Sequence, residues 1–176
     1  MLRPYLNVLP QLAKGAYVDD HAMVVGDVRI GEDSSLWPGV AVRGDVNRIV
    51  IGSRTNIQDN SVLHVTHQGP YSPEGFPLII GDEVTAGHRV ILHGCHIHHR
   101  ALIGMGCIIL DGAVVQEDVI IGAGSLVPEG KILESGYLYF GSPVVQRRPL
   151  TEAEKERIVY SAHYYVKIKN NYLHAN

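Results

Sequence analysis

Aliphatic residues recur every six positions along most of the chain. Hexads open at Val18, Val24, Ile30, Leu36 and Val42, and after a three-residue phase break at Ile51, Ile57 and Leu63. After a longer insertion the pattern resumes at Ile80, Ala86 and Leu92, and the last run opens at Ile97, Ile103, Ile109, Val115 and Ile121. Small or β-branched residues dominate the fifth place of these hexads. The repeat therefore organises most of the sequence.

A six-residue period fits neither an amphipathic helix nor a series of hairpins. It fits a triangular coil in which each hexad forms one short strand and one corner, with the opening aliphatic stacked on its equivalent about 4.8 Å away. Glycine, which occurs 19 times, and Asp or Asn supply the positive φ angles that some corners need. The period resembles the left-handed parallel β-helix of hexapeptide-repeat proteins, which we expect over about 18–130. A β-sandwich would not hold one phase over so many hexads.

The repeat is expected to break over 131–149, and a helix should follow over about 151–173. Thr151 and Glu154 have the spacing of a capping box. Helical spacing then gives one apolar stripe, formed by Ile158, Ala162, Tyr165, Ile168 and Tyr172. This stripe is suited to packing along the β-helix. Residues 1–176 are therefore predicted to form a single domain.

Composition narrows the class of protein. A chain of 176 residues with 45% hydrophobic and 19% charged residues is typical of one globular domain. The net charge of −3, without a basic run, gives no support for a nucleic-acid or anionic-membrane partner. No segment approaches the roughly 18 apolar residues of a membrane span, and the N-terminal residues do not resemble a signal peptide. Two cysteines fit a reducing compartment, so a cytoplasmic protein is expected.

Two histidines occupy equivalent places in the repeat. His64 and His93 are the second residues of the hexads that Leu63 and Leu92 open. If residues 68–79 form a loop outside the coil, Leu92 lies three hexads, or one full turn, after Leu63. The two histidines should then stack on one face, about one strand spacing apart.

A third histidine requires a neighbouring subunit. His88 is the third residue of the preceding hexad and therefore lies on another face, but in a homotrimer it can meet His64 and His93 of the next subunit. Three histidines with an open fourth position are typical of catalytic zinc, although iron or cobalt would suit the same ligands. The alternatives are solvated surface histidines, or a local site in the run His93, His96, His98 and His99, which a corner should keep apart.

Three motifs carry a family resemblance: VRGDV (42–46), NIQDNSVLH (56–64) and TAGHRVILHG (85–94). With them, the chain resembles the γ-class carbonic anhydrase-like proteins, and most closely their bacterial YrdA-like branch, over essentially its whole length. The resemblance implies His64, His88 and His93 as metal ligands. It also implies a homotrimer with three interfacial sites.

The resemblance implies roles for six further residues. Gln58 matches a glutamine that hydrogen-bonds metal-bound water, Asn56 lies on the same edge, and Tyr165 matches a helix tyrosine near the pocket. Charged residues that pair across the subunit interface and frame the site correspond to Arg43, Asp45 and Asp59. Interface structure for the charges and simple packing for the tyrosine are the alternative interpretations.

The reaction implied is reversible hydration of CO2 to bicarbonate by a zinc-bound hydroxide. The chain departs from the best-characterised members at Val46, where they carry an acidic residue. Its loop over 65–77 offers only Glu74 and His67 for proton transfer. Two other functions therefore stay open: a metal-binding trimer without significant CO2 activity, and an acyltransferase that uses acetyl-CoA, as many hexapeptide-repeat proteins do.

Overall fold

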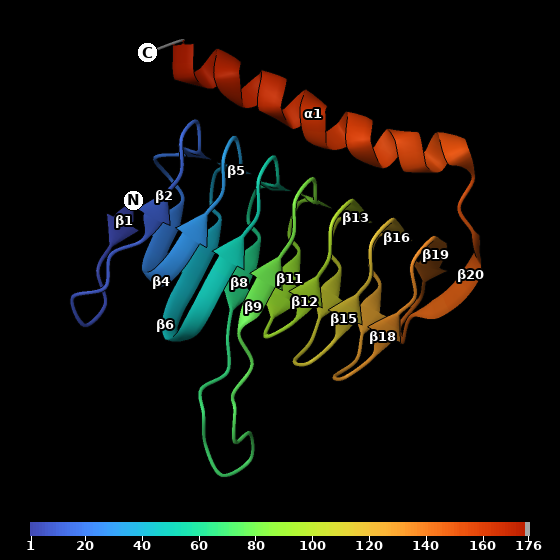
Figure 1. The fold of residues 1–176 in the computed structure, drawn as a ribbon, viewed down its shortest axis with the longest axis horizontal. Helices are drawn as coiled ribbons and strands as arrows, with labels where there is room; N and C mark the ends of the chain where they lie inside the picture. Colours follow the sequence, from blue (N-terminus) through green and yellow to red (C-terminus); the bar gives the residue numbers. More distant parts are fainter. Residues whose placement is uncertain (175–176) are drawn as a thin grey trace.

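The protein is a parallel β-solenoid with a helix along its side. A computed structural model describes residues 1–174, and in it successive strands wind into coils that stack along one axis (Figure 1). The predicted β-helix with a C-terminal helix is confirmed.

Two sheets form the walls of the coil. The 12-stranded sheet contains β1 (Leu2–Arg3), β2 (Gln11–Leu12), β4 (Met23–Ile30), β6 (Ala41–Ile51), β8 (Val62–His64), β9 (Leu78–Ile80), β11 (Ile91–His93), β12 (His96–Ile97), β14 (Ile108–Ile109), β15 (Val114–Val115), β17 (Leu126–Val127) and β18 (Ile132–Leu133). The 8-stranded sheet contains β3 (Tyr17–Val18), β5 (Ser35–Leu36), β7 (Asn56–Ile57), β10 (Thr85–Ala86), β13 (Ala101–Ile103), β16 (Val119–Ile121), β19 (Tyr137–Phe140) and β20 (Val145–Pro149). Because β6 pairs with β8 near its start and with β9 at its end, the larger sheet forms two faces of the triangle.

Hexad-opening aliphatics stack in columns inside the coil. One column is in register across six strands and is fully buried: Val24, Val42, Leu63, Leu92, Ile109 and Val127. Burying each such side chain contributes about 1.5–3 kcal/mol. The stacked columns therefore fix the register that positions the outward-facing residues of the same strands.

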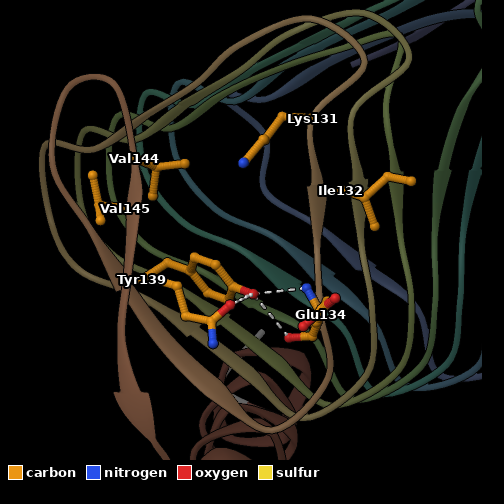
Figure 2. A pocket seen from close by; sticks show the side chains of 7 residues that line it. Lys131, Ile132, Glu134, Tyr139, Val144 and Val145 are labelled. Atoms are coloured by element: carbon orange, nitrogen blue, oxygen red, sulfur yellow. Dashed lines mark hydrogen bonds between the residues drawn. The ribbon is translucent and has the colours of Figure 1, made fainter.

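The solenoid extends beyond the predicted range at both ends. Strand β1 already pairs with β4, and β19 still pairs in parallel with β16. The predicted break at 131 is wrong because the six-residue phase continues through the buried Leu133 and Tyr139. The Tyr139 hydroxyl accepts a hydrogen bond from the Glu134 amide at 2.8 Å and lies 3.1 Å from Gln146 Oε1 (Figure 2). This polar cluster finishes the core at the C-terminal end, and the antiparallel β20 covers it.

Helix α1 (Glu152–His174) runs back along the solenoid toward its N-terminal end (Figure 1). The predicted capping box is confirmed, since the Glu154 amide donates to Thr151 Oγ1 at 3.3 Å and the Thr151 amide donates to Glu154 Oε2 at 2.9 Å. Within residues 1–174, no helix combines the length and the apolar character that crossing a bilayer requires. The role of α1 is to cover the 8-stranded sheet, where it contacts β5 and β10.

The buried side of α1 differs in one respect from the predicted stripe. Ile158 and Ala162 are buried as expected, but Tyr172 stays 49% exposed although its ring lies 5.2 Å from that of Trp37. The residue buried in the last turns is Lys169. Its ammonium donates to Asp33 Oδ1 at 2.6 Å, and this ion pair allows a lysine to occupy an apolar face.

Charged residues in the left-handed conformation form one corner of five successive coils: Asp33, Arg54, Glu83, Arg100 and Asp118. Their charges alternate along the axis. Arg54 pairs with Glu83 at 3.1 Å and Arg100 with Asp118 at 2.7 Å. The pKa of Glu83 would be raised by burial, but hydrogen bonds from His163 and Arg54 lower it below its usual value. The corner and α1 are thus tied together through Asp33 and Glu83.

We expect Asp33→Ala to lower the free energy of unfolding by about 1–3 kcal/mol, because it leaves the Lys169 ammonium buried without its carboxylate. Urea unfolding of the metal-free protein would measure the loss. Adding Lys169→Met should restore most of it, since the double variant buries no charge. Equal losses in the single and double variants would show that the ion pair does not stabilise the helix contact.

Candidate metal centre

His64 and His93 lie side by side on β8 and β11. The two residues are directly in register, so the stacking predicted by counting hexads is confirmed. Their ring centroids are 5.1 Å apart, and His64 Nδ1 lies 3.1 Å from His93 Nε2. Both rings point outward, because the residues before them, Leu63 and Leu92, fill the core.

A carboxylate contacts the outer nitrogen of each ring. Asp45 Oδ1 lies 3.2 Å from His64 Nε2, and Asp111 Oδ1 lies 2.6 Å from His93 Nδ1. Arg43 donates in turn to Asp45 Oδ2 at 2.5 Å. Burial alone would raise the pKa of Asp45, but the hydrogen bonds from Arg43 and His64 hold it below its usual value. Asp45 therefore stays ionised beside the ring.

The environment of His64 favours its neutral form. Burial lowers its pKa below the ordinary 6.5, the nearby Arg43 charge adds to that effect, and the hydrogen bond with Asp45 opposes it. The unfolded chain, whose histidine pKa is higher, thus takes up protons first as the pH falls. His64 stabilises the fold fully above its ordinary pKa, and this contribution is lost as the pH falls below 6.5. A neutral imidazole is also the form that binds a metal ion.

Two substitutions should move the His64 pKa in opposite directions. We expect Arg43→Ala to raise it, because a nearby positive charge is removed, and Asp45→Asn to lower it, because the anionic acceptor is lost. NMR titration of the His64 ring in chelator-treated protein measures both shifts. Shifts of the same sign in the two variants would contradict this electrostatic account.

His88 lies apart from this pair in the turn after β10. Its Nδ1 is 2.9 Å from Asp59 Oδ2, and both side chains are about half exposed. Within one chain, residues 1–174 bring no three His, Cys, Asp or Glu side chains into a cluster that could hold a metal ion. The geometry agrees with the expectation that His88 cannot reach His64 and His93 of its own subunit.

Gln58 and Asn56 belong to a chain of buried hydrogen bonds. Gln58 Nε2 donates to Asn56 Oδ1 at 3.1 Å, and Asn56 Nδ2 donates to Thr85 Oγ1 at 2.9 Å. Thr85 reaches Ser161 of α1 at 3.2 Å. The helix thereby braces the strand edge that carries both amides.

Tyr165 comes from the same helix. Its ring lies edge-on to Trp37 at 5.7 Å. Burial raises the pKa of its phenol, and the negative charge of Asp59 raises it further, so Tyr165 stays protonated. The observed contact of Tyr165 is therefore its packing against Trp37.

The other histidines of the run over 93–99 do not join this site. His96 and His98 stack on each other at 4.2 Å, and His99 lies 3.5 Å from Asp82. Two residues at this site were not predicted from the sequence: Asp111, and Thr66, whose Oγ1 donates to Asp111 Oδ2 at 2.6 Å. Counting one more coil past His93 reaches Leu110, because Ile109 is the in-register partner of Leu92, and Asp111 lies one residue beyond that position.

Known proteins share both the sequence and the fold. The chain is 58% identical to the protein YrdA of Escherichia coli over 98% of its own length and 94% of that protein. It is 41% identical to the mitochondrial gamma carbonic anhydrase 2 of Arabidopsis thaliana, over 94% of this chain and 60% of that one. The chain belongs to the γ-carbonic anhydrase-like family. Residues 94–129 also match the family model described as bacterial transferase hexapeptide (six repeats).

A solved structure extends the likeness to three dimensions. The hexapeptide transferase family protein from Anaplasma phagocytophilum superposes with a TM-score of 0.89 at 40% identity, covering 97% of both chains. Membership of this family agrees with the resemblance that the three motifs carry. The ligand role of each histidine is a separate matter, for which the geometry above supplies the argument.

Proposed function

We propose that this protein is a homotrimeric γ-carbonic anhydrase that binds Zn²⁺ through His64 and His93 of one subunit and His88 of the next. Iron or cobalt would suit the same ligands. Its reaction would be the reversible hydration of CO2 to bicarbonate in the cytoplasm. Family membership supports the reaction class, and the geometry of the histidine pair supports the metal.

The proposal rests on the three close contacts around the histidine pair, which are more than two neutral rings have N–H groups to donate. Two neutral imidazoles hold two N–H groups, but the row Asp45, His64, His93, Asp111 contains three close contacts. If each ring donates to its own carboxylate, His64 Nδ1 and His93 Nε2 are left as two lone pairs that face each other at 3.1 Å. Two facing lone pairs repel unless a cation lies between or beside them, which a metal ion would do.

An apolar surface beside the pair supports the trimer. Val62 and Ile91 precede the histidines by two residues, so they share the outward face, and they are 44% and 39% exposed. Next to them a groove is lined by His88, Met105 and Ile108, and Met105 is 58% exposed. Exposed, contiguous apolar residues are typical of interfaces. Packing of neighbouring subunits through this surface would bring His88 to the other two histidines.

The chain's own residues would hold and orient reactants around the metal. Zinc at this site would supply Lewis acidity and lower the pKa of a coordinated water to about 7. Gln58, braced through Asn56, presents an amide at the strand edge next to His88, and Gln58 and His88 line one groove with Ile103 and Met105. Such an apolar wall suits a small uncharged molecule such as CO2. Arg43, Asp45 and Asp59 frame the histidines.

Metal analysis of protein purified without chelator, followed by stopped-flow CO2 hydration, tests the proposal. We expect one zinc per histidine triad and hydration well above the buffer rate. A fully metallated trimer without hydration would favour the metal-binding alternative, and this outcome has one structural argument in its favour. Val46 is 44% exposed where an acid would be expected, and the nearby loop carries only the exposed Glu74 and His67. Acetyl-CoA turnover by metal-free protein would instead support an acyltransferase.

A further inference from the structure

Asp111 is held on both of its oxygens in a way that the proposed reaction does not explain. Oδ1 lies 2.6 Å from His93 Nδ1, and Oδ2 accepts the Thr66 hydroxyl proton at 2.6 Å. The Asp111 side chain is 18% exposed, so little water competes for these contacts. Thr66, His93 and Asp111 come from three successive coils at one corner of the solenoid.

A shortened corner makes this contact possible. From Leu92 to Ile97 the chain advances five residues, whereas the hexads that follow advance six. Gly94 turns this corner with φ +50°, and a methyl group there would overlap Asp111 Oδ1 and lie 2.7 Å from Phe76 Cβ. Only glycine therefore lets the carboxylate lean back over the preceding coil to reach His93.

Thr66 is itself fixed at the base of the loop that leaves the solenoid. The loop over 66–76 is closed by two backbone hydrogen bonds between Thr66 and Phe76, at 3.0 and 2.9 Å. The Asn47 amide also donates to the Thr66 carbonyl at 3.0 Å. Figure 1 shows this loop extending from between β8 and β9, away from α1. The hydroxyl of Thr66 thus lies at a rigid point where the loop and the coil meet.

We infer that Asp111, held by Thr66, is a positioning residue for His93. As acceptor for the Nδ1–H, it selects the tautomer that leaves Nε2 free and aims that atom at His64 Nδ1. The base of the 66–76 loop is thereby linked to metal affinity through two hydrogen bonds. This inference rests on the proposed metal site and names the residues that set its affinity.

The test is a Zn²⁺ affinity series, measured by competition with a chromogenic chelator on intact trimers. We expect Asp111→Ala to weaken binding by about 10- to 100-fold, as is usual for partners of ligating histidines. Thr66→Val keeps the shape but removes the hydroxyl, and should weaken binding less, by several-fold to about tenfold. Thr66→Ser keeps the hydroxyl and should restore wild-type affinity.

Asp82→Ala is the matched control. It removes a carboxylate from another histidine, His99, and also an acceptor of the Ser53 amide at 2.7 Å. It should therefore affect stability but leave zinc affinity unchanged. If it weakens zinc binding as much as Asp111→Ala does, general loosening of the coil explains the series and the inference is wrong.

A second readout needs no metal. Nitrogen-15 NMR of chelator-treated wild-type protein should find His93 protonated at Nδ1, and Thr66→Val and Asp111→Ala should shift it toward a mixture of tautomers. An unchanged tautomer in both variants, with wild-type zinc affinity, would overturn the inference. A wild-type trimer that binds no zinc but shows the tautomer shift would reject the proposed metal site while supporting the positioning role.

Discussion

Zinc binding is expected to return when His88→Ala chains and His93→Ala chains are assembled into mixed trimers. Trimers of either variant alone should contain no zinc. A site built from His88 of one subunit and His93 of the next is intact wherever the first subunit carries the His93 change and the second the His88 change. Random assembly places about one interface in four in that arrangement. Each single variant removes one of three ligands, and each should lose zinc binding almost completely.

Refolding equal amounts of the two chains, followed by metal analysis of the purified trimers, measures the recovery. Mixing the folded trimers without refolding is the control, because subunits that do not exchange cannot form mixed interfaces. No recovery in refolded trimers would mean that all three ligands belong to one chain. Retention of wild-type zinc by His88→Ala alone would remove that residue from the site.

Gly44→Ala is expected to lower the free energy of unfolding by about 3 kcal/mol. Gly44, in the VRGDV motif, pairs with Gly26 of β4 in a parallel register that shifts immediately afterwards. A methyl group on Gly44 would lie 2.5 Å from the Asp27 carbonyl oxygen, which belongs to the backbone and cannot move aside. The strands must separate, and Arg43 and Asp45 move with them.

Gly124→Ala is the control for this prediction. Unlike Gly44, Gly124 has a positive φ, at +70°, and nothing lies within 4 Å of an added methyl group. Only backbone strain remains there, which costs about 1–2 kcal/mol. Urea unfolding of both metal-free variants compares the two. A loss at Gly44 no larger than the loss at Gly124 would contradict the predicted cost of strand crowding.

The repeat made the strand register predictable because each inward aliphatic marks one face of the coil. That is why His64 and His93 could be paired across 29 residues once residues 68–79 were taken as a loop outside the coil. The two ends were harder to predict. Near the N-terminus, strands β1 and β2 are short and exposed, so they carry no inward marker, and at the other end Tyr139 continues a column that otherwise contains aliphatics.

Other features of the structure depend on contacts that no local sequence pattern predicts. Asp111 follows His93 by 18 residues, and its approach depends on a corner that is one residue short. From sequence, Lys169 is a polar residue that interrupts the apolar stripe of the helix. Its burial could not be predicted, because its partner Asp33 is 136 residues away. His88 could be placed on a different face from sequence, but its proposed ligand partners belong to a second subunit, whose position the sequence of one chain does not carry.

The closed base of the 66–76 loop gives this fold a modular insertion point. Thr66 and Phe76 meet through paired backbone hydrogen bonds, so the chain re-enters the coil next to where it left. A segment of different length or composition could be exchanged there while β8 and β9 keep their places. The sequence of the loop can thus diverge while the strands that hold the histidines stay unchanged.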